Sequence, residues 1–170
     1  MNDNKLIRLV LAALFAALSC VATLVISIPI PATNGYINLG DGVVLLGAFL
    51  LGPVCGMAAG GLGPMLADII LGYAVYAPGT LVIKALMALC AALVFRAMHR
   101  NTGGLILAAV VGELVMVLGY FAYEALLLGY GLAAAGSIPS NAIQGVAGII
   151  VSFLCYKALR GIPSIQKFCE

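Results

Sequence analysis

Long apolar segments follow one another along almost the whole chain, and this pattern limits the fold more than any other feature. Only 8% of the 170 residues are Asp, Glu, Lys or Arg, against about 25% in soluble domains, so charge cannot cover a globular surface. A helix needs about 20 residues to cross a membrane core, and six segments meet or approach that length: 6–28, 39–51, 54–72, 79–98, 103–128 and 138–159. The sequence therefore predicts an all-α integral membrane protein, one domain over residues 1–170 that forms a six-helix transmembrane bundle.

Prolines separate several of these segments. Pro29 and Pro31 end the first, because proline has no N–H to continue a helix, and a loop over 32–36 follows. Gly52-Pro53 divides the second segment from the third, and Pro78-Gly79 precedes the fourth. These breaks favour short turns between neighbouring spans.

Basic residues predict the orientation of the bundle. With six spans, the three basic clusters at the ends of spans all lie on one side, and the opposite loops contain no Lys or Arg. The clusters are Lys5 with Arg8, Arg96 with Arg100, and Lys157 with Arg160 and Lys167. Because cytoplasmic loops carry the excess of Lys and Arg, both termini are predicted to be cytoplasmic.

Several function classes lack their sequence signals. No G-x-x-x-x-G-K-[ST] loop occurs, so the chain does not hydrolyse ATP by that route. No nucleophile–base pair and no H-E-x-x-H is present, and the five cysteines occur singly, mostly in apolar runs. We expect neither an enzyme nor a metal site or cofactor, and the net charge of +2 gives no indication of nucleic-acid binding.

Lys84 lies more than one turn inside the apolar helix that begins near Gly79. A charge at mid-membrane costs roughly 2.5–3.5 kcal/mol. Lys84 lies nearer the outer end of its helix, where the cost is lower, but it still needs a partner. One explanation is a pair with a carboxylate, Glu124 being the candidate, that only locks the bundle. The other is a polar pocket in which Lys84 contacts a ligand.

Polar residues at similar depth favour the pocket. Helical spacing puts Tyr120 and Glu124 on one face of the fifth segment, and Asn141 and Gln144 on one face of the sixth. Ligand pockets combine apolar walls with a few convergent polar groups, and the outer-loop tyrosines 36, 73 and 76 could cover a planar ring. Glu113 lies deeper, and neither Glu113 nor Asp68 receives a role.

Four alanines of the first segment form two overlapping small-xxx-small pairs: Ala12, Ala13, Ala16 and Ala17. Small residues four apart let another backbone approach closely. Two interpretations remain open, packing within the bundle or a docking face for a separate membrane subunit.

These features together resemble a known family. The six short spans, the alanine pattern, GYINLGDGVVLLGAFLLGP (35–53), ADIILGY (67–73) and YAPGTLVIKAL (76–86) are similar to the substrate-binding S components of energy-coupling factor (ECF) vitamin transporters. The likeness covers nearly the whole chain, and residues 35–86 carry its specific part. It is greatest to the branch for riboflavin, pyridoxine or hydroxymethylpyrimidine.

The resemblance implies a multi-pass protein of a prokaryotic plasma membrane. It would bind a vitamin from outside, dock on a T subunit with two cytoplasmic ATPases, and present the four alanines to that T subunit. The expected substrate-binding residues are Asn34, Tyr36, Asn38, Asp41, Tyr76, Lys84, Tyr120, Glu124, Asn141 and Gln144. Their polarity favours pyridoxine or hydroxymethylpyrimidine over riboflavin. The alternative is a proton-coupled carrier that acts alone, with Glu113 and Glu124 as its relay.

Overall fold

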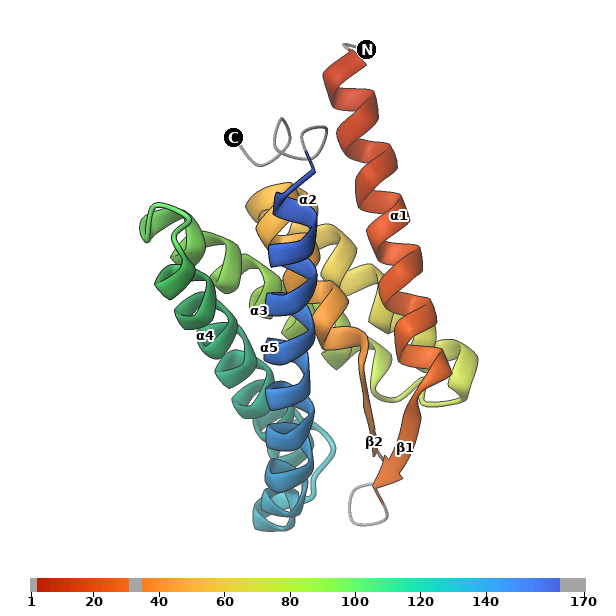
Figure 1. The fold of residues 1–170 in the computed structure, drawn as a ribbon. Coiled ribbons are helices and arrows are strands. Elements are labelled where there is room, and N and C mark those ends of the chain that lie inside the picture. Colours follow the sequence, from red (N-terminus) through yellow and green to blue (C-terminus); the bar gives the residue numbers. More distant parts are fainter. Residues whose placement is uncertain (1–2, 31–34, 163–170) are drawn as a thin grey trace.

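The computed structural model is a bundle of long helices with one small β-hairpin (Figure 1). It describes residues 3–30 and 35–162, with side chains for 5–29 and 36–162. The elements, in chain order, are α1 (Asp3–Val25), β1 (Ser27–Ile30), β2 (Gly35–Asn38), α2 (Gly40–Leu71), α3 (Ala77–Ala97), α4 (Thr102–Ala122), the π-helical turn η1 (Tyr123–Leu127), the 3-10 helix η2 (Gly131–Ser137) and α5 (Ile138–Arg160).

Helix α2 is bent back on itself at Gly52. Gly52 has φ 77° and ψ −175°, a conformation that glycine adopts without the steric cost of a Cβ. A Cβ at Gly56 would lie 2.7 Å from the Cα of Ala48, and one at Gly60 would lie 2.9 Å from Val44 Cγ1. Both contacts join residues equally distant from Gly52 in sequence, so the two arms run antiparallel.

This bend changes the number of spanning elements. Within the described residues, five helical elements are long and apolar enough to cross a membrane, rather than the six predicted. The predicted segments 39–51 and 54–72 are the two arms of the single element α2. The first arm, residues 40–51, is about 18 Å long at 1.5 Å per residue, which is shorter than a hydrocarbon core.

The prediction of a purely helical fold is wrong at one place, where the structure has a β-hairpin. Helix α1 ends at Val25, so the predicted span 6–28 is too long, and β1 pairs antiparallel with β2 in the register Ile28↔Ile37 and Pro29↔Tyr36. The predicted loop over 32–36 overlaps the start of β2. Proline cannot continue a helix here, but an edge strand tolerates it. A strand of four residues gives a pattern that is too short to recognise in the sequence.

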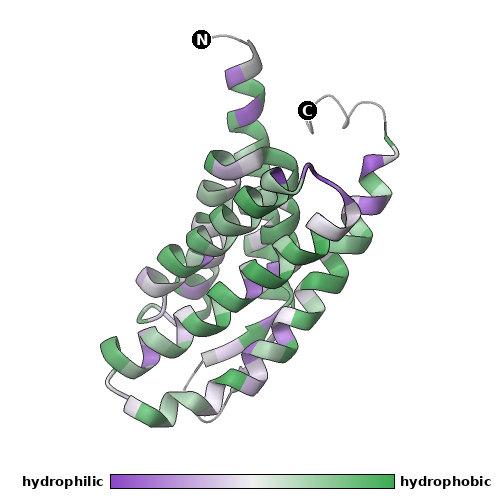
Figure 2. Cartoon of the chain, turned by 90° about the vertical axis from the view of Figure 1, so that its left-hand side faces the viewer, coloured by the Kyte–Doolittle hydropathy of each residue, from purple (hydrophilic) through white to green (hydrophobic). Residues whose placement is uncertain are grey.

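The remaining boundaries agree closely with the sequence, and the chain alternates direction through α3, α4 and α5 (Figure 1). The start of α1 and the end of α5 lie at the same end of the bundle, and the hairpin lies at the other (Figure 1). Figure 2 shows hydrophobic residues over most of the helices, with hydrophilic segments at the end where the N and C labels lie.

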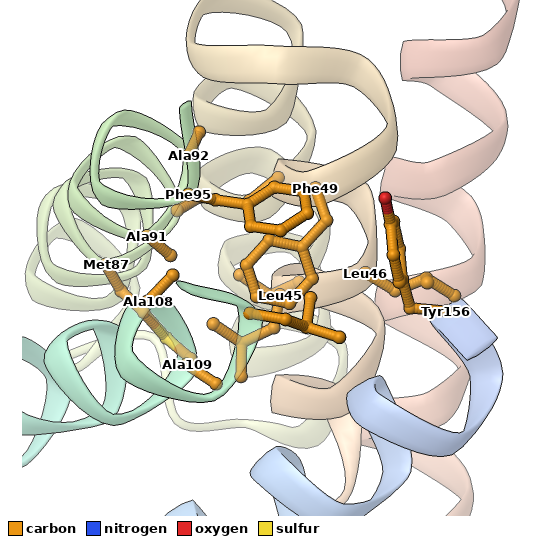
Figure 3. Close-up of a cluster of buried hydrophobic side chains, with 14 of the residues drawn as sticks. Leu45, Leu46, Phe49, Met87, Ala91, Ala92, Phe95, Ala108, Ala109 and Tyr156 are labelled. Atoms are coloured by element: carbon orange, nitrogen blue, oxygen red, sulfur yellow. The ribbon is translucent and has the colours of Figure 1, made fainter. Parts of the chain in front are cut away.

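The apolar core lies between the first arm of α2 and helices α3, α4 and α5 (Figure 3). Phe95 is its centre: its ring lies 5.0 Å from that of Phe49 and 5.4 Å from that of Tyr156, measured between centroids. Alanines of α3 and α4, such as Ala91 and Ala108, are fully buried in this core. Small residues at these contacts let the helices approach closely.

Candidate functional site

Polar residues from distant parts of the chain line one cavity of about 30 Å³. It lies among β2, the second arm of α2, η1, and the ends of α3, α4 and α5 that lie near the β-hairpin. The lining residues are Tyr36, Asn38, Pro64, Asp68, Tyr76, Thr80, Lys84, Tyr120, Glu124, Asn141 and Gln144. Every predicted binding residue is among them except two: Asp41 lies behind the lining, and Asn34 falls outside the described residues.

Lys84 lies at the floor of the cavity and forms an ion pair with Asp41. Both side chains are buried, and Gln144 Nε2 donates a hydrogen bond of 2.6 Å to the second carboxylate oxygen of Asp41. The Lys84 ammonium also lies 5.4 Å from the centroid of the Tyr120 ring, which is within cation–π range. The intramembrane charge is thus compensated by a carboxylate, an amide and an aromatic face.

Glu124, the candidate partner named from the sequence, is not the carboxylate with which Lys84 pairs. Glu124 accepts hydrogen bonds from the Ser137 hydroxyl (2.6 Å) and the Tyr76 hydroxyl (3.2 Å) instead. These contacts connect η1 to the start of α3 and the end of η2. Glu124 therefore joins parts of the cavity wall that the Lys84–Asp41 pair does not join.

Gln144 connects the hairpin to the last helix. Its Oε1 accepts a 2.7 Å hydrogen bond from the backbone N–H of Asn38 in β2. The Asn38 side chain in turn accepts the N–H of Gly40, at 2.8 Å, where α2 begins. One amide side chain therefore holds the β-hairpin, the start of α2 and helix α5 in register.

Tyr36 closes the opposite wall. Its hydroxyl donates a 2.6 Å hydrogen bond to Asp68 Oδ1, and its ring centroid lies 4.8 Å from that of Tyr73. Burial, reinforced by the Asp68 carboxylate, raises the pKa of the Tyr36 phenol far above its usual range. The phenol therefore stays protonated and can donate a hydrogen bond. Tyr73 packs against the Tyr36 ring but does not itself line the cavity.

Pro64, Asp68 and Thr80 line the cavity but were not among the predicted binding residues. The Thr80 hydroxyl lies 2.9 Å from that of Tyr120, and the buried Oδ2 of Asp68 makes no hydrogen bond within the described part of the chain. Helical spacing carries a signal for Thr80, because it lies four residues before Lys84 and so shares its face. The position of Asp68 at the cavity depends on the fold-back of α2, which helical spacing does not reveal.

Two further polar side chains behave differently. The Asn141 amide lines the cavity, is 6% exposed and forms no hydrogen bond with any other described residue. Glu113 lies deeper, beside Gly145 and Gly148, and neither of its carboxylate oxygens has a hydrogen-bond partner among the described residues. Asn141 is thus available to a ligand at the cavity, whereas Glu113 does not reach the lining.

The four alanines of α1 divide into two pairs. Ala12 and Ala16 are half-buried, and a Cβ at Gly63 in the second arm of α2 would lie 2.3 Å from the Ala16 carbonyl oxygen. Ala13 and Ala17 are exposed. The packing interpretation therefore fits one pair, and the other remains on the outer surface of the bundle.

The comparisons with known proteins agree with this architecture. A solved structure titled "Structure and mechanism of the S component of a bacterial ECF transporter" matches 94% of this chain and 98% of its own, with a TM-score of 0.75 and 27% identity. A protein of Pyrococcus woesei, described as an uncharacterized protein in the gap 3' region, is 43% identical over 131 residues, which are 77% of this chain and 86% of that protein. The model of the family described as "ECF-type riboflavin transporter, S component" matches residues 3–161. The chain therefore belongs to this family of ECF transporter S components.

Proposed function

We propose that this chain is the subunit that captures a heteroaromatic vitamin from outside the cell and delivers it to an ECF transporter complex. The observation that carries the proposal is the cavity: lining residues from six elements converge on it, among them an Asn141 amide with no hydrogen-bond partner among the described residues. A membrane-embedded polar cluster of this kind is expensive to form. Ligand binding gives a reason for its presence that the Lys84–Asp41 pair alone does not.

The proposed topology has six crossings, with both termini in the cytoplasm. The fold-back of α2 at Gly52 supplies the extra crossing, and the basic residues Lys5, Arg8, Arg96, Arg100, Lys157 and Arg160 all belong to the chain segments at the end opposite the hairpin. By the positive-inside rule that end faces the cytoplasm. The cavity then opens outward, and ATP hydrolysis belongs to the two ATPases that dock with the T subunit.

Riboflavin is the first candidate ligand, because the family description names it. The sequence favoured the smaller rings of pyridoxine and hydroxymethylpyrimidine, and the cavity does not decide between them. Its volume of about 30 Å³ is close to the share of one water molecule in the liquid, so the cavity has to widen before any of these vitamins enters.

The test is direct binding to the purified chain without ATP. Riboflavin, pyridoxine and hydroxymethylpyrimidine are titrated separately by calorimetry, with quenching of flavin fluorescence as a second readout. We expect saturable binding of one of them at one site per chain. Binding of pyridoxine alone would overturn the choice of riboflavin, and binding of none would overturn the vitamin-capture function.

One observation favours a second function, the proton-coupled carrier. Glu113 keeps a buried carboxyl group with no hydrogen bond to a described residue, as a proton-carrying residue inside a membrane would. Proteoliposomes that contain this chain alone decide between the two functions. Accumulation driven by a pH gradient supports the carrier, whereas uptake that requires the T subunit, both ATPases and ATP supports the S component.

A further inference from the structure

A second pocket, of about 130 Å³, lies at the opposite end of the bundle from the vitamin cavity. Three arginines from separate chain segments line it: Arg8 of α1, Arg96 of α3 and Arg100 of the α3–α4 turn. The rest of its wall is the bend of α2, residues 50–55. None of these residues takes part in the cavity described above.

The three guanidinium groups have no carboxylate partner among the residues whose side chains the structure describes. No ion pair joins Arg8, Arg96 or Arg100 to an acidic side chain that the structure describes. The described carboxylates of Asp41, Asp68, Glu113 and Glu124 belong to the vitamin cavity or to the interior beside it. Like charges that line one pocket repel one another, so an anion bound there would relieve this repulsion.

The backbone around the pocket also favours an anion. The second arm of α2 starts at Pro53, directly after the non-helical Gly52, so the positive end of its dipole lies at the pocket wall. His99 and Arg100 have φ of 51° and 53°, a region that non-glycine residues seldom occupy. This tight turn keeps Arg100 half-buried beside the end of α3, instead of letting it extend into solvent.

The apolar part of the wall favours an anion that carries hydrocarbon chains. Leu50 and Leu51 line the pocket together with Val54, which is 73% exposed on the outer surface. On α1, Leu9 and Val10 beside Arg8 are 62% and 57% exposed, so apolar surface continues from the pocket along the membrane-facing side. Basic pockets between transmembrane helices bind anionic headgroups in this way.

We propose that this pocket, defined by Arg8, Arg96 and Arg100 at the bend of α2, binds the phosphate group of an anionic phospholipid. Guanidinium groups hold phosphate oxygens in bidentate hydrogen bonds, and the pocket volume, about four times that of a water molecule in the liquid, admits a phosphate. The acyl chains lie along the exposed apolar residues of α1 and α2. The site joins three elements and holds the hinge of the α2 hairpin.

Native mass spectrometry of the purified chain tests the proposal, with phosphatidylglycerol or phosphatidylcholine as the added lipid. We expect the wild type to retain phosphatidylglycerol preferentially. Arg8→Gln, Arg96→Gln and Arg100→Gln should each weaken retention by roughly fivefold, the effect of one basic residue near an anionic surface. The matched control is Arg160→Gln, which removes the same charge at the same end but does not line the pocket.

Additional variants and ligands distinguish a lipid site from a site for free phosphate or for a partner protein. Arg96→Lys keeps the charge without the bidentate geometry and should retain lipid at an intermediate level, and the melting temperature of each variant checks that it is folded. Stabilisation by inorganic phosphate equal to that by the lipid would overturn the lipid as the ligand. Equal lipid retention by the pocket variants and by Arg160→Gln would overturn the site. If those variants instead lose only assembly with a T subunit, the pocket is a protein-docking site.

Discussion

Lys84 and Asp41, 43 positions apart in sequence, form an ion pair in which each side chain is only about 1% exposed. The pair joins α3 to the start of α2 at the floor of the cavity. Removing one member of a buried pair leaves an uncompensated charge, whereas removing both leaves none. Stability and ligand binding can therefore be tested separately at this position.

The first prediction concerns the pair itself. Lys84→Met should destabilise the protein by about 3–5 kcal/mol, because the Asp41 carboxylate stays buried without its cation. The double variant Lys84→Met/Asp41→Asn should recover most of this loss. Thermal unfolding in detergent measures both, with Lys157→Met as the control, since Lys157 is exposed and donates a hydrogen bond to the Thr102 hydroxyl. A single variant as stable as wild type would show that the pair does not hold the bundle.

The second prediction concerns ligand contact. Asn141→Ala should weaken vitamin binding about fivefold to tenfold, the effect of one hydrogen bond of about 1 kcal/mol, without lowering the melting temperature, because the amide has no partner among the described residues. Ser152→Ala is the control, since the Ser152 hydroxyl bonds to the Ile149 carbonyl of the same helix, away from the cavity. If Asn141→Ala and Lys84→Ala both bind the vitamin normally, the cavity is not the binding site.

The third prediction concerns charge selectivity. Two carboxylates line the cavity, Asp68 and Glu124, and its cation Lys84 already pairs with Asp41. A phosphate group would be repelled, so the phosphorylated form of the vitamin should bind at least tenfold more weakly than the free form. Competition against the bound vitamin measures this ratio. Equal affinities would mean that the phosphate stays outside the carboxylate-lined part of the cavity.

The fourth prediction concerns the fold-back of α2. Gly56→Ala should destabilise the protein by more than about 1 kcal/mol, the cost expected for overpacking, because the new Cβ would lie 2.7 Å from the Ala48 backbone. Gly103→Ala is the matched control in α4, where the nearest atom is 3.5 Å away. Similar melting temperatures for the two variants would contradict the tight contact between the arms.

The fifth prediction concerns partner docking. Ala13→Leu and Ala17→Leu add bulk to the exposed side of α1, so they should abolish co-purification with a T subunit while the vitamin still binds. Ala16→Leu lies on the inner side, beside Gly63 of α2, and should lower the melting temperature instead. Normal assembly of both exposed-side variants would place the docking face elsewhere.

Much of the fold could be predicted because a membrane imposes strong patterns on a sequence. Apolar length located the helices, and Gly52-Pro53 located the break, since few residues besides glycine tolerate the φ found there. The length pattern did not show that the two arms form one folded-back element. The short strands β1 and β2 were missed because four residues carry too little periodicity.

The cavity could be predicted as a group of residues but not as a set of contacts. Depth along each helix brought Lys84, Tyr120, Asn141 and Gln144 to one level. Depth does not tell how each helix is rotated or which neighbours it has, so it makes Glu124 a candidate partner of Lys84 and does not single out Asp41, with which Lys84 pairs. Asp68 was noticed but not placed, because its position depends on the fold-back of α2.

The bond between the Asn38 N–H and Gln144 has a consequence for biosynthesis. Asn38 belongs to the first quarter of the chain, whereas Gln144 and Asn141 belong to its last helix. While the ribosome is still making α5, the nascent chain can already contain the Lys84–Asp41 pair but lacks one wall of the cavity. The cavity is therefore completed only when α5 is inserted, because Asn141 and Gln144 form part of its wall.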